Sequence, residues 1–266
     1  MLTALVAKAV AELREPPEMV GSEAVPPALP KPAVGGAALP QLRPEQEAVL
    51  QDLLTAYEAP GFSRRLLRGV TGSGKTEVYL RLLERVVGQG VGAILLVPEI
   101  GLTPLMIRRV RDRFGSGVGL LHSGLSRGDR IREYRRIVDG RVRIVVGARS
   151  AVFAPVHDLR LIIIDEAHDP SYKQEEEPRY HASTVARMRL DPVQGLLLEG
   201  SATPSVEAMR DAGARLRLAR RAAGTQPTCE VVDMRRQGAD RLLAPLSREV
   251  LAETLRRGEQ AILLLN

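Results

Sequence analysis

The stretch Gly69-Val-Thr-Gly-Ser-Gly-Lys75-Thr76 decides the fold, because it fits the phosphate-loop pattern G-x-x-x-x-G-K-[ST] in full. Its glycines let successive backbone N–H groups curl around a phosphate at the positive end of the following helix. We expect Lys75 to reach the phosphate oxygens and the Thr76 hydroxyl to bind Mg²⁺. A glycine loop used only for packing does not require Lys-Thr at its end. The predicted nucleotide-binding residues of the loop are Gly69, Val70, Thr71, Gly72, Ser73, Gly74, Lys75 and Thr76.

Apolar runs alternate with helix-length segments on both sides of this loop. Continuous apolar strands separated by helices are typical of a parallel sheet that is covered on both faces. The sequence therefore predicts an α/β fold, a doubly wound and mostly parallel sheet with helices on both faces. A further helix is predicted to begin at Pro44, which suits a first helical position. The strand candidates are 66–67, 93–97, 118–121, 142–146, 161–164 and 196–198, and the helix candidates are 75–88, 102–114, 126–139 and 181–190.

Three segments are predicted along the chain. Residues 16–44 hold eight of the 18 prolines, so residues 1–43 are interpreted as a short helix (1–15) followed by a proline-rich linker. Residues 44–225 form the α/β domain. Residues 226–266 resemble the beginning of another α/β unit, with strands expected at 229–232 and 261–265 and a helix at 246–257. Because the sequence stops directly after an apolar run, we expect it to be cut short.

An acidic pair follows the apolar run Ile162-Ile-Ile. In phosphate-loop enzymes a strand-end Asp holds Mg²⁺ and an adjacent Glu orients and deprotonates the attacking water, which predicts these roles for Asp165 and Glu166. An acidic pair after a strand more often marks a solvated turn, but a complete phosphate loop in the same α/β pattern favours catalysis. A lone histidine is more often structural. Within Asp-Glu-Ala-His, however, His168 is predicted to bridge to the next motif.

That next motif is Gly200-Ser-Ala-Thr-Pro204, directly after the apolar run 196–198. The hydroxyls of Ser201 and Thr203 at a strand end could link a nucleotide site to a neighbouring surface by hydrogen bonds. The alternative is a helix N-cap, since a hydroxyl residue followed by proline is good capping chemistry. The pattern alone does not decide between them.

Composition narrows the class of protein. A net charge of +6 and a pI near 9.9 favour a polyanionic partner such as nucleic acid. Only four of the 38 basic residues are lysines, a skew that arginine-rich codon usage would also produce. No apolar run approaches the roughly 20 residues of a membrane span, so we expect a cytoplasmic protein. The single cysteine, Cys229, excludes a disulfide framework and a multi-cysteine zinc site within this chain, and is predicted to be buried in a strand.

The phosphate loop, the Asp165-Glu-Ala-His box and the Ser201-Ala-Thr motif, in this order, resemble the first motor lobe of a superfamily 2 helicase, a RecA-like domain. More narrowly, residues 41–266 are similar to the replication-restart helicases of the primosomal protein N′ (PriA) family, whose box is DEAH or DEEH. The segments that carry this resemblance are 69–80, 97–104, 122–126, 147–155, 172–174, 178–182, 200–205, 232–235 and 258–260.

The resemblance implies an ATP-dependent 3′-to-5′ DNA helicase of the bacterial cytoplasm, with ATP and Mg²⁺ as cofactors. It implies action on branched forks and single-stranded DNA in replication restart and primosome assembly. The implied protein partners are the single-stranded-DNA-binding protein and primosome or helicase-loading proteins; no membrane is involved. Zinc is expected for the full-length family, but the cysteines that would bind it are absent from this chain.

The resemblance also assigns roles to single residues. Gln46 stands where the family recognises adenine, and Lys75, Thr76, Asp165 and Glu166 carry phosphate binding, Mg²⁺ binding and catalysis. Loop 172–181 looks like the family's aromatic-rich loop, which senses single-stranded DNA by base stacking. The alternative for that loop is an ordinary exposed turn, because its three consecutive glutamates would repel phosphate. The implied coupling residues are His168, Ser201 and Thr203, and the implied DNA contacts are Thr103, Arg149, Ser150, Tyr172, Arg179 and Tyr180.

The sequence departs from the family at several positions. Ala167 replaces a usual Glu, Ser183-Thr184 replaces Arg-Asp, and Glu199 stands where an apolar residue is expected. The second lobe, which supplies arginine fingers, is not in the chain, so we expect weak nucleotide binding and no unwinding by the chain alone. The main alternative is a DNA- or primosome-binding module that does not hydrolyse ATP. A kinase or transport ATPase would not account for the Ser201-Ala-Thr motif.

Overall fold

The computed structural model describes residues 40–98, 101, 104–221, 228–234 and 243–264. The chain divides into two compact units, residues 1–224 and residues 225–266. The helix and most of the linker predicted for residues 1–43 lie outside the described residues, as does Thr103. No helix of the described segments has the length and apolar character that a membrane crossing requires.

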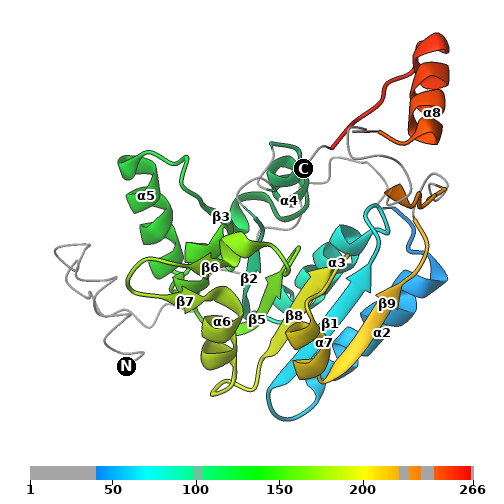
Figure 1. Cartoon of the computed structure of the whole chain (residues 1–266). Helices are drawn as coiled ribbons and strands as arrows, with labels where there is room; N and C mark the ends of the chain where they lie inside the picture. The colour runs from blue at the N-terminus through cyan, green and yellow to red at the C-terminus, as the bar shows by residue number, and fades with distance from the viewer. Residues whose placement is uncertain (1–39, 99–100, 102–103, 222–227, 235–242, 265–266) are drawn as a thin grey trace. The chain divides into compact units, whose positions relative to one another are not determined.

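The first unit is built on a seven-stranded sheet in the order β3-β4-β2-β5-β8-β1-β9 (Figure 1). Every neighbouring pair in this sheet is parallel. The carboxyl ends of the strands therefore lie at one edge, where ligands bind in open α/β sheets. The strands are β1 (Ser63–Gly69), β2 (Gly92–Leu96), β3 (Val118–Leu121), β4 (Ile144–Gly147), β5 (Leu159–Ile164), β8 (Leu196–Ser201) and β9 (Ala214–Leu218).

Helices cover both faces of the sheet. Successive residues of a strand point to opposite faces, and β5 shows the consequence: Leu161 and Ile163 pack in one core, Ile162 and Ile164 in the other. The first core includes side chains of α2 (Pro44–Glu58), α3 (Lys75–Val87) and α4 (Pro104–Phe114). The second includes side chains of α5 (Arg127–Val138), the 3₁₀ segment η3 (Arg149–Phe153) and α6 (Ala182–Leu190). The predicted doubly wound α/β fold is confirmed.

Six strands lie at the predicted apolar runs, and the seventh, β9, was not predicted. Its sequence alternates Arg215 and Arg217 with leucines, and both arginines are exposed because β9 is an edge strand with one open face. A two-stranded antiparallel hairpin, β6 (Lys173–Gln174) and β7 (Tyr180–His181), also lay in a segment predicted to be a loop. The remaining short elements of this unit are η2 (Gly115–Gly117), η4 (Pro170–Tyr172) and α7 (Val206–Asp211).

The second unit contains α8 (Pro245–Arg256), where a helix was predicted. The strands predicted at 229–232 and 261–265 are wrong for the residues that the structure describes, which have no regular structure there. A strand requires a hydrogen-bonded neighbour, and none of the described residues of this unit forms one. Cys229 is exposed, so the prediction that it is buried is also wrong. Ile262 and Leu264 are likewise exposed.

Candidate nucleotide site

The phosphate loop connects β1 to α3 at the carboxyl edge of the sheet. Gly72 and Gly74 have φ angles of 76° and 86°, a left-handed conformation that glycine adopts without steric cost. Helix α3 begins at Lys75, with Gly74 as its N-cap. The first N–H groups of a helix have no partner within it, so the loop presents free donors at a positive helix end. This geometry suits an anion.

Lys75 is almost fully buried beneath this loop. Its Nζ donates to the Gly69 carbonyl at 3.0 Å and lies 3.3 Å from Glu166 Oε1. The Ser73 hydroxyl is also buried, and it finds no hydrogen-bond partner among the described residues. A buried polar group without a partner is costly, so the loop holds a cation and an unused hydroxyl where a phosphate would be bound.

Gln46 and Arg43 fix the loop from the side of α2. Gln46 Nε2 donates to the Gly74 carbonyl at 3.2 Å, and its Oε1 accepts from the Arg43 N–H at 3.0 Å. Arg43 donates from its guanidinium to the Ser73 carbonyl at 2.5 Å. The structure thus places Gln46 against the loop, while its contact with adenine remains a prediction. Arg43 was not predicted, because a residue just before a helix carries no signal for so distant a partner.

The acidic pair lies at the end of β5. Glu166 has a φ of 45°, a left-handed conformation that is uncommon outside glycine. Such backbone strain concentrates at functional sites. The Asp165 carboxyl is deeply buried. Its burial, and next the neighbouring charge of Glu166, raise its pKa, whereas Lys75 and a hydrogen bond from Tyr79 act against this rise. A cation bound beside Asp165 would favour its ionised form.

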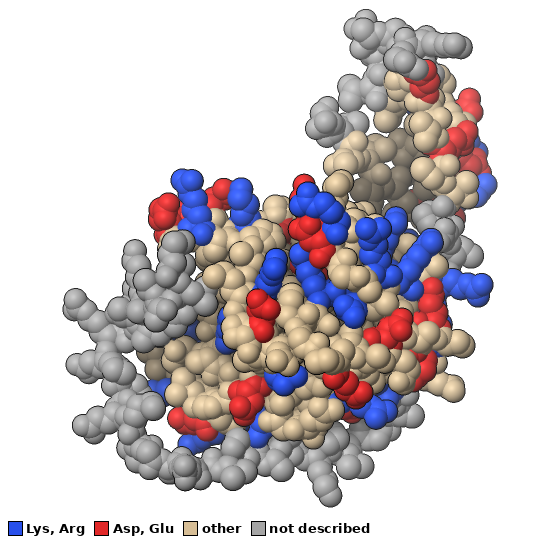
Figure 2. All heavy atoms as spheres, turned by 90° about the horizontal axis from the view of Figure 1, so that it is seen from below, with Lys and Arg blue, Asp and Glu red and all other residues tan. Residues whose placement is uncertain are grey.

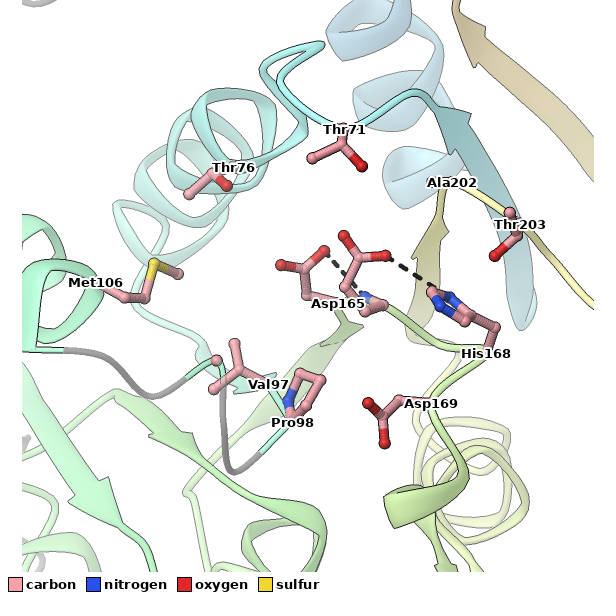
Figure 3. Close-up of a pocket in the computed structure, with 12 residues that line it drawn as sticks. Thr71, Thr76, Val97, Pro98, Met106, Asp165, His168, Asp169, Ala202 and Thr203 are labelled. Atoms are coloured by element: carbon pink, nitrogen blue, oxygen red, sulfur yellow. Dashed lines mark hydrogen bonds and ion pairs between the residues drawn. The ribbon is translucent and has the colours of Figure 1, made fainter. Parts of the chain in front are cut away.

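The phosphate loop, the acidic pair and the third motif border one cavity of about 610 Å³. Figure 3 shows Thr71 and Thr76 on one side of this space, facing Asp165 and His168. Val97 and Pro98, at the end of β2, close it from below in that view. The lining residues are Thr71, Thr76, Val97, Pro98, Gly101, Met106, Asp165, Glu166, His168, Asp169, Ala202 and Thr203.

His168 joins the acidic box to the third motif. A hydrogen bond of 2.8 Å connects His168 Nδ1 and Ser201 Oγ, and Ser201 Oγ also accepts from the Thr203 N–H at 3.0 Å. The Ala167 N–H donates to the Gly200 carbonyl at 2.8 Å, so the two motifs are also tied through their backbones. The same nitrogen, His168 Nδ1, also lies 3.6 Å from Glu166 Oε2. This chain of contacts runs from the carboxylate to Thr203, but its role in coupling remains a prediction.

The oxygen donors of this cavity suit Mg²⁺. The Thr76 hydroxyl and the Asp165 carboxylate both border it, and Mg²⁺ is a hard ion that prefers oxygen. Among the described residues no cluster of three or more His, Cys, Asp or Glu could hold a metal. In many Mg²⁺ sites one or two protein oxygens and the substrate phosphates share the ion.

The predicted DNA contacts that the structure describes lie apart from the cavity lining. Ser150 is exposed, and Arg179 is exposed beside Glu177, 3.7 Å away. Arg149 donates to the carbonyls of Ser171 and Lys173 at 3.0 and 2.6 Å, so its guanidinium holds the loop that follows the acidic box. Seen from below (Figure 2), basic and acidic side chains are interspersed, so this face alone marks no path for DNA.

The two tyrosines of the aromatic-rich loop have different environments. Tyr172 is fully buried and donates through its hydroxyl to the Asp165 carbonyl at 2.6 Å. The prediction that its ring stacks on a base is therefore wrong for this structure, because a buried ring offers no face. Tyr180 is half-buried, makes an edge-to-face contact with Phe153 and lies 5.8 Å from the Arg149 guanidinium. Tyr180 remains a predicted stacking residue.

Glu199 stands where an apolar residue was expected, and the structure supplies the reason that it is tolerated. It is buried in β8, and Arg64 of β1 binds it at 2.8 Å. Burial lowers the pKa of nearby His181, while the negative charge of Glu199 raises it. The buried carboxylate of Glu199 is therefore paired with the Arg64 guanidinium.

Asp165→Asn should stabilise the chain at neutral pH by about 1 kcal/mol, as substitutions at strained functional sites commonly do. A raised carboxyl pKa means that folding disfavours the ionised form. The gain should therefore be present above the raised pKa and vanish as the pH falls to the unfolded value near 3.8. Thermal melts followed by circular dichroism between pH 4 and about 8 measure it.

Asp169→Asn is the matched control, with the opposite sign. Asp169 accepts from the Ser171 N–H at 2.8 Å, and hydrogen bonds from Ser171 lower its pKa. Asp169 therefore contributes stability above its unfolded pKa that is lost as the pH falls through the folded value. A loss of stability in both variants at neutral pH would contradict the assignment for Asp165.

Comparison with known proteins agrees with this geometry. A family model described as DEAD/DEAH box helicase matches residues 43–212. The replication restart protein PriA of Bacillus subtilis (strain 168) is 46% identical over 233 residues, which cover 85% of this chain and 29% of that protein. The protein of the same name from Treponema pallidum (strain Nichols) is 44% identical over 227 residues, covering 84% and 34%. The chain thus spans about a third of the length of these curated relatives.

Solved structures show the same fold. RecG bound to a three-way DNA junction superposes with a TM-score of 0.50 and 21% identity, over 66% of this chain and 24% of that one. The Hef helicase domain of Pyrococcus furiosus gives a TM-score of 0.50 at 17% identity, over 67% and 38%. At such identities the likeness concerns the fold alone, a RecA-like helicase domain.

Proposed function

Because the chain belongs to the DEAD/DEAH box helicase family, we propose that it is the ATP-binding lobe of a DNA helicase that acts in replication restart. The observation that carries the proposal is the convergence of three motifs on one cavity. The phosphate loop, the acidic pair and the Ser201-Ala-Thr motif come from different strands of the sheet, yet all border the same 610 Å³ space. The names of the similar curated proteins support the biological process.

Each residue has a defined task in this proposal. Lys75 and the N–H groups at the start of α3 bind the β- and γ-phosphates. Thr76 and Asp165 would hold Mg²⁺, which when bound neutralises the charge of the transferring phosphoryl group. Glu166 orients the attacking water and takes its proton. Because Lys75 lies 3.3 Å from Glu166 without nucleotide, arriving phosphates would take over Lys75 and leave Glu166 to the water.

The contact chain from Glu166 through His168 to Ser201 and Thr203 supports a coupling role. A charge that changes at Glu166 on hydrolysis would alter its interaction with His168. His168 is in turn hydrogen bonded to Ser201 at the end of β8. This is the route by which the proposal connects hydrolysis with DNA movement, in a protein that acts from the 3′ to the 5′ end on branched forks and single strands. Single-stranded-DNA-binding protein and primosome-loading proteins are the partners that belong to the same proposal, in the bacterial cytoplasm.

Lys75→Ala should weaken binding of a fluorescent ATP analogue by tenfold or more. A hydrogen bond to a charged group contributes about 1.5–3 kcal/mol, and about 1.4 kcal/mol corresponds to tenfold in affinity. Fluorescence anisotropy with this chain in the presence of Mg²⁺ measures the affinity. All residues that line the site belong to one lobe. We therefore expect the chain alone to bind nucleotide without unwinding a DNA fork.

Lys173→Ala is the matched control, since it removes the same charge from an exposed lysine that pairs with Glu175 at 2.9 Å. Its affinity should equal that of the unaltered chain. Equal affinities for the Lys75 and Lys173 variants, or no binding by the unaltered chain, would overturn the proposed ATP site.

A further inference from the structure

Tyr79 links three elements of the site, although it does not border the cavity. It lies on α3, one turn after Lys75, and is completely buried. Its hydroxyl donates to Asp165 Oδ1 at 3.1 Å, across 86 residues of sequence. Its ring lies against the backbone of Gly200 in β8, so closely that a Cβ on Gly200 would stand 2.8 Å from Tyr79 Cζ and closer still to its oxygen. The phosphate-loop helix, the acidic box and the third motif therefore meet at one phenol.

Within the described segments, the two hydrogen bonds that the Asp165 carboxylate accepts both end on Oδ1. Oδ1 accepts from the Tyr79 hydroxyl and from the Glu166 N–H, at 3.1 and 3.0 Å. The Asp165 N–H donates to the Leu96 carbonyl at 2.9 Å, and the Asp165 carbonyl accepts from Tyr172. Figure 3 shows the other carboxylate oxygen directed into the cavity. With both Oδ1 donors in place, rotation of the carboxylate would break two hydrogen bonds.

The chemistry of the phenol suits a permanent donor. Its burial, and next the negative charge of Asp165, raise the pKa of Tyr79 well above its ordinary value, so the phenol stays protonated. A neutral hydroxyl that donates to a carboxylate forms a charge-assisted hydrogen bond, and it stabilises the ionised form that a cation requires. A residue that hydrogen bonds to a metal ligand orients that ligand and tunes its affinity for the metal.

We propose that Tyr79 is a positioning residue for Mg²⁺: it occupies Asp165 Oδ1, so that the second carboxylate oxygen is presented to the ion beside Thr76. The inference rests on the proposed function, because it concerns the same site.

Tyr79→Phe tests the inference, because it removes the hydroxyl and keeps the ring. With this chain, a fluorescent ATP analogue is held at fixed concentration and Mg²⁺ is titrated. The Mg²⁺ concentration at half-maximal binding should rise about tenfold, the lower end of the 10–100-fold effect typical of such partners. Binding of the analogue with excess chelator should be unchanged, since Tyr79 does not touch the phosphate loop's cavity. A merely structural role would lower the melting temperature and leave the Mg²⁺ midpoint in place.

Tyr57→Phe is the control, because Tyr57 is a buried tyrosine of α2 whose ring faces Arg160 rather than the acidic pair. It should keep the Mg²⁺ midpoint of the unaltered chain. An unchanged midpoint in Tyr79→Phe overturns the inference while leaving the proposed function intact. Failure of the unaltered chain to bind the analogue at any Mg²⁺ concentration overturns the proposed function, and the inference with it.

Discussion

Arg64→Ala should lower the free energy of unfolding by about 3–5 kcal/mol, because it leaves a buried carboxylate without its partner. Glu199 is 2% exposed, and Arg64 binds its Oε2 from two guanidinium nitrogens at 2.8 Å. Asp211 lies 3.9 Å from Arg64, but its side chain is exposed, so water replaces that contact. Urea denaturation followed by circular dichroism measures the loss.

Two further variants separate charge burial from other effects of the substitution. Arg64→Ala combined with Glu199→Leu should recover part of the lost stability, because leucine removes the unpaired buried charge. Arg68→Ala, on the same strand but exposed, should change stability by no more than about 0.5 kcal/mol. If the double variant is as unstable as Arg64→Ala alone, the unpaired carboxylate is not the cause.

The parts of the fold that the sequence predicted are those whose signal is local. Each of the six predicted strands contains a buried apolar run, which in β1 is only Leu66-Leu67. The edge strand β9 was not predicted, because its solvent-facing side chains include arginines, which are typical of helices and loops. The strands expected at 229–232 and 261–265 are absent from the described part of these segments for the converse reason. An apolar run becomes a strand only where another strand hydrogen bonds to it, and apolar character alone does not provide one.

The residues of the site also differ in whether a local sequence pattern predicts them. Lys75 and Thr76 were predicted from the fixed spacing of the phosphate-loop pattern, and Asp165 and Glu166 from an apolar run that ends in two carboxylates. Tyr79 was not, since four residues after Lys75 it has the pattern of an ordinary core residue on an amphipathic helix. Tyr172 was predicted to stack on a base because loop 172–181 resembles the aromatic-rich loop of the family. The 3₁₀ turn η4 instead directs it inward, a consequence of backbone geometry that residue types do not encode.

Gly200→Ala should lower the free energy of unfolding by about 3 kcal/mol, at the upper end of the cost of overpacking a core. The added Cβ would stand 2.8 Å from Tyr79 Cζ and closer to the hydroxyl, and Tyr79 has no space to retreat because it is fully buried. The backbone of Gly200 is held in turn by β-sheet pairing and by the Ala167 N–H. The strain should therefore displace the phenol from Asp165, and Mg²⁺-dependent nucleotide binding should weaken together with stability.

Tyr79→Phe in the Gly200→Ala background identifies the atom responsible. Removing the hydroxyl eliminates the closest overlap and leaves the smaller one with Cζ at 2.8 Å, so the double variant should be more stable than Gly200→Ala alone. Because the two residues touch, their effects should not add, and a coupling of about 1–3 kcal/mol is expected from a double-mutant cycle. Additive effects would mean that Gly200 is required by the backbone rather than by Tyr79. Recovery of stability without recovery of the Mg²⁺ midpoint, by contrast, is the result expected if space for the ring maintains the fold and the hydroxyl positions Asp165.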